Sequence, residues 1–353
     1  MALRMLEKFD LRPEDLLAGV VVREVPTFAQ VDPLVRERVP APSRRIYGTY
    51  WDRIVAVWGD RRLDEPTATE VRQLLERARE TAVVRRSSNG GKAAALHTYY
   101  ALSCVYRYAV EEQILSPRQN VIARVERPAK GRSRRQALTP ALYGEIWRAA
   151  TSTGNDPALD ALLLRLHLET AARLGGVMGL RLRDLDEDQS LVLLREKGST
   201  RRWQPVSPTM MSYLRHHAHD RGAREDDSRV LRFLNGDTLT KKRYETLWNR
   251  VGGYVDSVRV RGISTHWLRH TTLTWVERNF GLAVAGAFAG HAEPSSNKHG
   301  ATHVYVKADL GEVATALQAL THERHPLAEQ PLSIVTSGDI HPLQVPEDGA
   351  RVR

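Results

Sequence analysis

The chain lacks the features that mark secreted or membrane-bound proteins. Its 353 residues include a single cysteine, Cys104, so no disulfide can form within the chain. No apolar run approaches the roughly 20 residues that a membrane-spanning helix needs. Charged residues occupy the N-terminus, where a signal peptide would need an apolar stretch. These absences predict a cytoplasmic protein with no membrane partner.

Negative charge is also scarce. The chain has 52 lysines and arginines against 42 aspartates and glutamates, which gives a formal net charge of +10. A basic balance of this size favours a polyanionic partner, because lysine and arginine release counterions when they bind phosphates. Nucleic acid and an anionic membrane surface both fit the charge alone. The length suggests about two domains.

Helical periodicity and breaks rich in proline or glycine divide the chain into five segments. Residues 26–42 have the pattern of a proline-punctuated approach to a helical domain, whose clearest helix is expected over 93–113. The predicted segments are an N-terminal extension (1–24, with a short helical-looking piece), a helical domain (25–127), a basic linker (128–136), a second domain (137–322) and a polar tail (323–353).

The second domain is predicted to be mainly α with a small β-sheet, an α+β fold. Threonine followed by proline is typical of a helix start, and alternating apolar residues bounded by a glycine turn favour a hairpin. The expected elements are a helix that starts at Thr139 and Pro140, an apolar helix over 162–170, a β-hairpin over 191–206 with Lys197 and Gly198 at its turn, and helices from Ser264 and over 309–320.

Two basic stretches are candidate phosphate contacts. One precedes the helix over 93–113, where a helix N-terminus and adjacent cations favour an anion. The other is the linker, which could follow a DNA backbone. A solvated loop or linker explains each stretch about as well. A nucleotide-binding P-loop is not expected, because alanine follows Lys92 where that motif has serine or threonine. The candidate contacts are Arg85, Arg86, Lys92, Lys130, Arg132, Arg134 and Arg135.

The most informative motif is His266, Arg269 and His270, whose spacing places all three side chains on one face of a helix. Two histidines four residues apart also suit zinc, but no glutamate follows the first histidine and no obvious third ligand is near, so no metal site is predicted. Taken alone, residues 266–270 would by default be interpreted as a helix face of histidines and an arginine with a purely structural role. Together with Arg173 before it and Tyr305 after it, the set suits attack on a phosphodiester: arginines neutralise the oxygens, histidines move protons and a phenol attacks phosphorus.

This ordered set resembles the tyrosine recombinases, or phage integrases, a family that includes the Xer proteins. The resemblance covers roughly residues 40–322. The blocks that carry it are Thr170 to Arg173 with Leu180 to Asp186, Lys197-Gly198, His266 to His270, Ala289 to His291, and Thr302 to Tyr305. The resemblance implies a helical, SAM-like core-binding domain and a catalytic domain that close on DNA as a C-shaped clamp.

The resemblance also assigns roles to single residues. Arg173 and Arg269 would hold the non-bridging oxygens of the scissile phosphate, a task that suits planar guanidinium groups. Tyr305 would attack phosphorus and form a 3′-phosphotyrosyl link. The other roles are Lys197 as general acid for the leaving oxygen, His266 as a proton-transfer group and His291 as a phosphate ligand. No metal, no ATP and no other cofactor is implied.

The implied partner is double-stranded DNA with paired inverted-repeat core sites, and Arg201 and Arg202 join the candidate DNA contacts. The implied assembly is a homotetramer in the synapse, with a monomer or weak oligomer off DNA and an accessory DNA-bending protein as a further partner. The host is a prokaryotic or phage-infected cell, with the protein on the nucleoid when bound to DNA. The process would be integration, excision or resolution of a mobile element or replicon, through a Holliday junction. A type IB topoisomerase-like enzyme and a catalytically silent DNA-binding relative are the alternatives.

Some features depart from the family's pattern or leave a choice open. Gly176 stands where the family often has a supporting glutamate, so support for Arg173 must come from elsewhere. The segment between His291 and Tyr305 is longer than is common, which leaves open whether the tyrosine acts in its own site or in a neighbour's. The apolar stripe of the helix over 309–320 fits either packing on its own domain or docking on an adjacent protomer.

Overall fold

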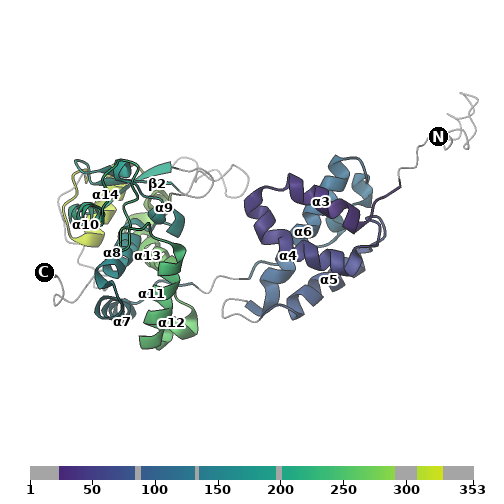
Figure 1. The fold of residues 1–353 in the computed structure, drawn as a ribbon, viewed down its shortest axis with the longest axis horizontal. Coiled ribbons are helices and arrows are strands. Elements are labelled where there is room, and N and C mark those ends of the chain that lie inside the picture. Colours follow the sequence, from purple (N-terminus) through teal and green to yellow (C-terminus); the bar gives the residue numbers. More distant parts are fainter. Residues whose placement is uncertain (1–23, 84–88, 132–134, 196–200, 291–307, 329–353) are drawn as a thin grey trace, which may run out of the picture. The chain divides into compact units, whose positions relative to one another are not determined.

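The computed structural model describes residues 24–83, 89–131, 135–195, 201–290 and 308–328 (Figure 1). Contacts divide the chain into two compact units, Met1–Ser133 and Arg134–Arg353. This division falls inside the segment that the sequence marks as a basic linker. The helical-looking piece near the N-terminus lies outside the described residues.

The first unit is helical where it is described, with α6 at its centre packed against α3, α4 and α5. Two buried aromatic residues satisfy their polar atoms inside the apolar core: Trp51 Nε1 donates to Ala101 O at 2.9 Å, and Tyr106 OH donates to Leu63 O at 3.0 Å. The elements are α3 (Phe28–Arg38), α4 (Ala41–Trp58), α5 (Ala68–Glu80), η1 (Asn89–Gly91), α6 (Lys92–Glu111), η2 (Pro117–Gln119) and η3 (Val121–Arg124).

Helix α3 corrects the prediction for residues 26–42, which the sequence suggested to be a proline-punctuated approach. Thr27 and Gln30 form a capping box at its start, a signal that the prolines obscured. Pro33 lies inside the helix and removes one backbone donor. The Arg36 side chain donates to Asp32 at 2.8 Å one turn away, which supports the helix across this gap.

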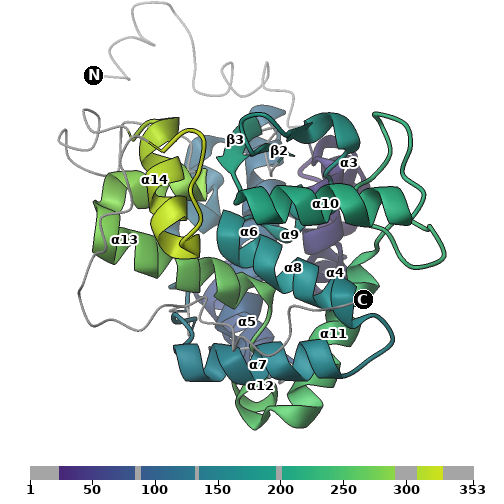
Figure 2. The same cartoon turned by 90° about the vertical axis from the view of Figure 1, so that its left-hand side faces the viewer.

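The second unit combines helices with a small antiparallel sheet of strand order β1-β2-β3 (Figures 1 and 2). The predicted mainly α fold with a small sheet is confirmed. Helix α8 packs against α7, α10 and α13. The elements are α7 (Pro140–Ser152), α8 (Pro157–Thr170), α9 (Leu174–Met178), η4 (Leu182–Asp184), β1 (Leu185–Asp186), β2 (Leu191–Arg195), β3 (Arg201–Pro205), α10 (Pro208–Asp220), α11 (Lys241–Tyr254), α12 (Asp256–Arg261), α13 (Thr265–Ala289) and α14 (Leu310–Thr321).

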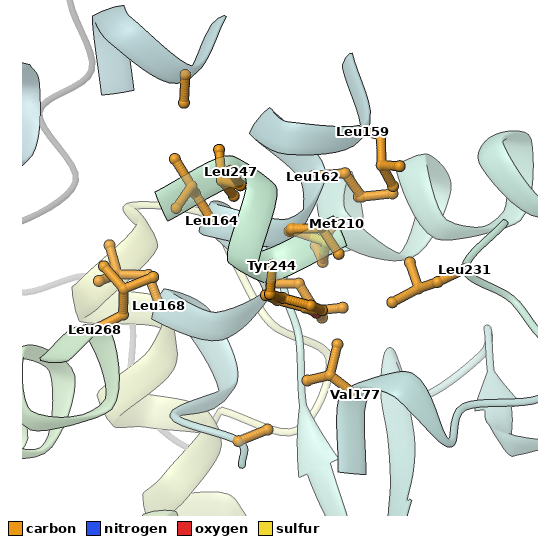
Figure 3. Close-up of a cluster of buried hydrophobic side chains, with 14 of the residues drawn as sticks. Leu159, Leu162, Leu164, Leu168, Val177, Met210, Leu231, Tyr244, Leu247 and Leu268 are labelled. Atoms are coloured by element: carbon orange, nitrogen blue, oxygen red, sulfur yellow. The ribbon is translucent and has the colours of Figure 1, made fainter. Parts of the chain in front are cut away.

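Helix α8 forms the middle of the second core. Asp156 caps it by accepting from Leu159 N at 3.2 Å, and Pro157 occupies the first turn. Its apolar residues lie all round the helix, as expected of a helix that is covered on every side. Figure 3 shows leucines of α8 packed against side chains of other elements, including Met210 and Leu247. The C-terminal end of α8 is therefore packed on its neighbours within the hydrophobic core.

A separate apolar cluster joins α13, α14 and the end of α8. Within α13, Gly281 breaks the helix with φ 83° and ψ 172°, a conformation open essentially to glycine alone. Of the stripe on α14, Val313, Leu317 and Leu320 are at most 4% exposed. The helix lies beside α13 (Figure 2). The stripe therefore packs on its own domain in the single chain, and docking of this helix on an adjacent protomer stays a prediction.

The residues after α14 also belong to the second unit, although the sequence placed them in a polar tail beginning at 323. The Glu323 carboxylate accepts from Arg165 Nη2 at 2.6 Å. His325 is 5% exposed and its Nε2 lies 3.2 Å from Ser190 O, in the turn between β1 and β2. These contacts attach the segment through Ala328 to the domain. The tail boundary at 323 was wrong because two polar side chains pack inward.

Candidate active site

Arg269 is a buried cation held by two helix ends. It is 4% exposed in α13 and donates to Ala171 O, at the end of α8, and to Ala289 O at 2.7 Å, at the end of its own helix. A buried charge needs such partners, and carbonyls at helix C-termini carry partial negative charge. Arg269 thereby joins the turn that leads to Arg173 with the residue that ends α13.

Arg173 follows a tight turn. Ala171 ends α8 with φ 47° and ψ 22°, in the left-handed region that an L residue rarely adopts. Ala172 N donates to Thr170 Oγ1 at 3.2 Å, and Arg173 becomes the N-cap residue of α9. The Arg173 carbonyl accepts from Gly176 N at 3.0 Å. Hydrogen bonds made by the main chain before and at Arg173 thus fix the backbone position from which its half-buried side chain extends.

His266 and His270 lie one turn apart on α13, with ring centroids 5.1 Å apart and planes at 81°. Burial, together with positive charge on Arg135, His270, Arg269 and Arg173, lowers the pKa of His266 to about 4. Burial together with Arg135 and Arg269 also lowers the pKa of His270. Both imidazoles are therefore neutral at neutral pH. A bound phosphate would raise both pKa values, because a nearby anion favours the protonated ring.

Arg135 thus lies near the two histidines, although the sequence grouped it with the linker cations. The chain after it is attached to the start of α13, since Leu138 N donates to Thr271 Oγ1 at 2.9 Å. The Gln136 side chain accepts from Arg261 at 3.4 Å. Arg135 consequently belongs to the positive surroundings of the site.

Arg202 contacts the same region from β3. Its guanidinium donates to Gln204 Oε1 and to Thr170 O at 3.4 Å. Gly290 has φ 61°, a conformation that favours glycine, and a Cβ built on it would lie 2.3 Å from Arg202 Cδ, so a larger residue would also displace the Arg202 side chain. Arg202 therefore packs against the ends of α8 and α13. Its neighbour Arg201 is exposed.

A buried carboxylate ties the hairpin to α8. The Glu169 side chain is fully buried and accepts from Arg165 Nε at 2.6 Å, from Ser207 N at 2.9 Å and from Ser207 Oγ at 3.0 Å. Ser207 follows β3 and caps α10. The Thr209 amide donates to Glu323 at 3.1 Å, which brings the chain after α14 into the same group. The hairpin is thus held to the helix that leads to Arg173.

Three predicted catalytic residues, Lys197, His291 and Tyr305, lie outside the described residues. Their neighbours in the chain are described: Arg195 pairs with Arg201 across the hairpin, Gly290 ends α13, and α14 begins at Leu310. Among the predicted DNA contacts, Lys92 and Lys130 are exposed on the first unit. The predicted contacts outside the described residues are Arg85, Arg86, Arg132 and Arg134.

Sequence reasoning missed two polar residues in the apolar helix over 162–170. His167 and Glu169 are buried there at 1% and 0% exposure, and both bond to residues beside the site. An ionisable residue inside a helix that is apolar all round is itself a signal, because its burial requires specific partners. Across the described ranges, no cluster of three or more histidine, cysteine or acidic side chains suits a metal ion. In the same part of the chain, no helix is long and apolar enough to cross a membrane.

The chain has recognisable relatives. The model of the phage integrase family matches residues 136–307. The tyrosine recombinase XerD of Lacticaseibacillus casei is 23% identical over 232 residues, which covers 64% of this chain and 74% of that protein. The tyrosine recombinase XerC of Chlamydia caviae is 28% identical over 174 residues, which covers 47% of this chain and 51% of that protein. The chain thus spans about half the length of this second relative.

Solved structures share the fold. A lambda integrase tetramer bound to a Holliday junction superposes with a TM-score of 0.60 at 17% identity, over 87% of this chain and 85% of that one. The XerH site-specific recombinase bound to a palindromic difH substrate gives a TM-score of 0.59 at 14% identity, over 75% of this chain and 78% of that one. At these identities the likeness establishes the fold.

Proposed function

Because the chain belongs to the phage integrase family of tyrosine recombinases, we propose that it is a site-specific DNA recombinase. The observation that carries this proposal is the gathering of Arg173, His266 and Arg269 at the ends of α8 and the start of α13. Guanidinium groups neutralise the charge of a phosphodiester, and neutral imidazoles beside them can accept a proton. This combination suits attack on a phosphodiester.

The proposed reaction exchanges one phosphodiester for another. The Tyr305 phenol loses its proton and attacks phosphorus, the bond to the 5′ oxygen breaks, and Lys197 protonates that oxygen. Arg173, Arg269 and His291 hold the phosphate oxygens as charge develops. A 5′ hydroxyl then attacks the 3′-phosphotyrosine and releases the tyrosine. The covalent link conserves the energy of the phosphodiester, so the proposed reaction requires no ATP. The arginines supply the charge stabilisation for which other enzymes use a metal, so no metal is proposed.

His266 has a defined protonation state for this reaction. With its pKa lowered to about 4 by burial and nearby arginines, it is a neutral imidazole in the DNA-free protein. A neutral ring can accept the phenolic proton as the attack begins. The phosphate raises the pKa of the ring, which makes proton acceptance more favourable in the complex than in the free protein.

The proposed partner is double-stranded DNA with paired inverted-repeat core sites, in a homotetramer that resolves a Holliday junction. The solved neighbours include a lambda integrase dimer on a core site and a tetramer on a Holliday junction, which supports this proposal by analogy. Integration, excision or resolution of a mobile element or replicon in the cytoplasm is the proposed process. The exposed Lys92 and Lys130, together with the other predicted basic residues, would contact the DNA backbone.

The proposal is tested by covalent trapping on nicked duplexes taken from candidate host and mobile-element DNA. The intact protein is compared with Tyr305→Phe, and the captured DNA is sequenced. Adducts on a few related inverted repeats, absent with Tyr305→Phe, are expected. Adducts spread over unrelated sequence would instead indicate a type IB topoisomerase-like enzyme. DNA binding without any adduct would contradict the proposal and favour a catalytically silent relative.

A further inference from the structure

His167 is a buried ionisable side chain that the proposed reaction does not use. It lies within α8 at 1% exposure, and burial lowers its pKa to about 4, so its ring is neutral at neutral pH. Its Nδ1 is 3.1 Å from Ala172 O, and its Nε2 is 3.1 Å from the hydroxyl of Tyr244. Ala172 immediately precedes Arg173.

These contacts define which ring nitrogen carries the hydrogen. A carbonyl oxygen only accepts, so Nδ1 of His167 donates to Ala172 O. In a neutral ring Nε2 then accepts, and the Tyr244 hydroxyl donates to it. The two rings also meet edge to face, with centroids 5.5 Å apart. Figure 3 shows Tyr244 within the hydrophobic cluster of the second core.

Tyr244 is itself held in register with α8. Its neighbour Arg243 is 5% exposed and donates from Nε to Asp160 Oδ1 at 2.9 Å. Asp160 is fully buried in α8, two turns before His167. A buried ion pair of this kind is costly to separate. The ion pair therefore fixes the position of α11 along α8, and with it the position of the Tyr244 hydroxyl next to His167.

The turn that His167 contacts needs such support. Ala171 adopts a left-handed conformation that is unfavourable for alanine and persists only when its surroundings determine it. The carbonyl of Ala171 accepts from Arg269, and the next carbonyl accepts from His167. Gly176, where the family often has a supporting glutamate, has no side chain to contribute.

We propose that His167 and Tyr244 are positioning residues for Arg173. Their hydrogen bonds hold the Ala172 carbonyl and so orient the peptide from which Arg173 projects toward the phosphate. This inference rests on the proposed recombinase function and supplies the support for Arg173 that Gly176 cannot give. Neither residue contacts DNA in this scheme, and both act through the main chain.

Two isosteric substitutions separate the two contacts of His167. In His167→Asn the amide nitrogen can take the place of Nδ1, so the bond to Ala172 O is kept and the bond to Tyr244 is lost. In His167→Gln the amide reaches the place of Nε2, so the contact with Tyr244 is kept and the bond to Ala172 O is lost. His217→Leu is the control for loss of a half-buried histidine elsewhere, since His217 lies in α10 and its Nε2 accepts from Arg232 N.

Single-turnover cleavage is measured with saturating protein on the nicked duplex recovered by covalent trapping. We expect His167→Gln to cleave about ten- to a hundredfold more slowly than the parent, because small misplacement of a phosphate ligand is costly. Its Kd for DNA should stay within about threefold. His167→Asn should lose less rate than His167→Gln, because it keeps the bond to Ala172 O and loses only the support of Tyr244, and His217→Leu should cleave within about threefold of the parent. Equal losses for His167→Asn and His167→Gln would overturn the inference.

A methylphosphonate at the scissile position tests whether the loss passes through Arg173. This substrate lacks one charged oxygen and depends less on an arginine to neutralise it. The gap between the parent and His167→Gln should therefore shrink severalfold on it. An unchanged gap would show that His167 acts by another route and would overturn the inference.

A measurement without cleavage keeps this inference separable from the proposed function. The Nε–H resonance of Arg173 is observed by NMR in the DNA-free protein labelled at arginine. His167→Gln should shift or broaden that resonance, while His167→Asn, which keeps the bond to Ala172 O, should move it less. If the parent forms no adduct but this pattern holds, the recombinase function fails and the positioning role stands. If the position and width of the Arg173 resonance do not change in His167→Gln, the positioning role is overturned.

Discussion

Arg135 is a solvent-exposed charge whose effect reaches two half-buried rings. The chain after it is attached to α13 through Leu138 and Thr271, and its charge lowers the pKa of both His266 and His270. Because Arg135 lowers the pKa of both imidazoles, it favours their neutral form before an anion binds at the site. The linker therefore contributes to the chemistry of the site as well as to the connection between the units.

Removing this charge should raise the pKa of both histidines. In Arg135→Ala, the imidazole resonances of His266 and His270 should titrate at higher pH in DNA-free protein, as followed by NMR. Arg261→Ala is the matched control, because Arg261 lies 4.8 Å from the Trp267 ring centroid near the start of α13 but is not among the charges that shift the two rings. Equal shifts in both variants would mean that only the net charge matters.

Ala171 combines an unfavourable backbone conformation with full burial in the cluster of α13 and α14. Glycine would relieve about 1 kcal/mol of strain but would lose a buried methyl of about 0.8 kcal/mol, so Ala171→Gly should leave stability within about 1 kcal/mol. Ala171→Val adds bulk to a filled space in a conformation that branched residues resist, and should cost at least about 2 kcal/mol. Urea unfolding of both variants measures this. Similar losses in both would contradict the role of the positive φ.

At the scale of elements, α14 is part of the core of its own domain. Leu317→Ala should therefore lower the free energy of unfolding of the DNA-free protein by about 2–5 kcal/mol, the usual cost of a buried cavity. The measurement is denaturant unfolding at low protein concentration. Leu282, which is 58% exposed on α13, gives the matched control, and Leu282→Ala should have little effect. An unchanged stability for Leu317→Ala would contradict packing in its own domain and favour docking on a neighbour.

Elements with strong local signals could be predicted from the sequence. Thr139 caps α7 with Pro140 in its first turn, and the hairpin strands β2 and β3 lie within the expected 191–206. Helix α3 was missed because Pro33 suggested a break, while the capping box at Thr27 was the stronger signal. The packed residues after α14 were missed because inward-facing polar side chains such as His325 have no periodic pattern.

In the site, too, local sequence features could be predicted, whereas contacts between residues far apart in the chain could not. The types and order of Arg173, His266 and Arg269 predicted that they lie together, and the structure brings the three close; their catalytic roles stay a prediction. The contacts that hold them could not be predicted, because they join main-chain carbonyls to side chains far along the chain. The bond from Arg269 to Ala171 O and that from Tyr244 to His167 are examples. Such contacts depend on how α8, α11 and α13 pack.

At the scale of the whole molecule, buried neutral histidines predict acid sensitivity. The pKa of His167 is lowered from 6.5 to about 4, so the unfolded chain binds more protons than the native chain between these values. The contribution is fully present above pH 6.5 and decreases as the pH falls toward about 4, by roughly 3 kcal/mol at most. Burial raises the pKa of Glu169, which acts in the opposite direction.

Comparison with a variant isolates the contribution of His167 to the pH dependence of stability. Stability of the parent and of His167→Gln is measured by urea unfolding at several pH values from 7 to 4.5. The parent should lose stability more steeply than the variant on acidification, since the variant has no ring to protonate. Parallel curves would mean that His167 does not titrate on unfolding in this range.

The attachment of Arg269 to carbonyl oxygens has a consequence for how this sequence could diverge. Every residue type presents a carbonyl, so replacement of Ala171 or Ala289 by another residue that keeps the backbone path leaves both acceptors in place. Selection need preserve only the arginine and the course of two helix ends. Solved structures at 14–17% identity share this fold, and an attachment to main-chain oxygens tolerates such sequence change better than one between two side chains would.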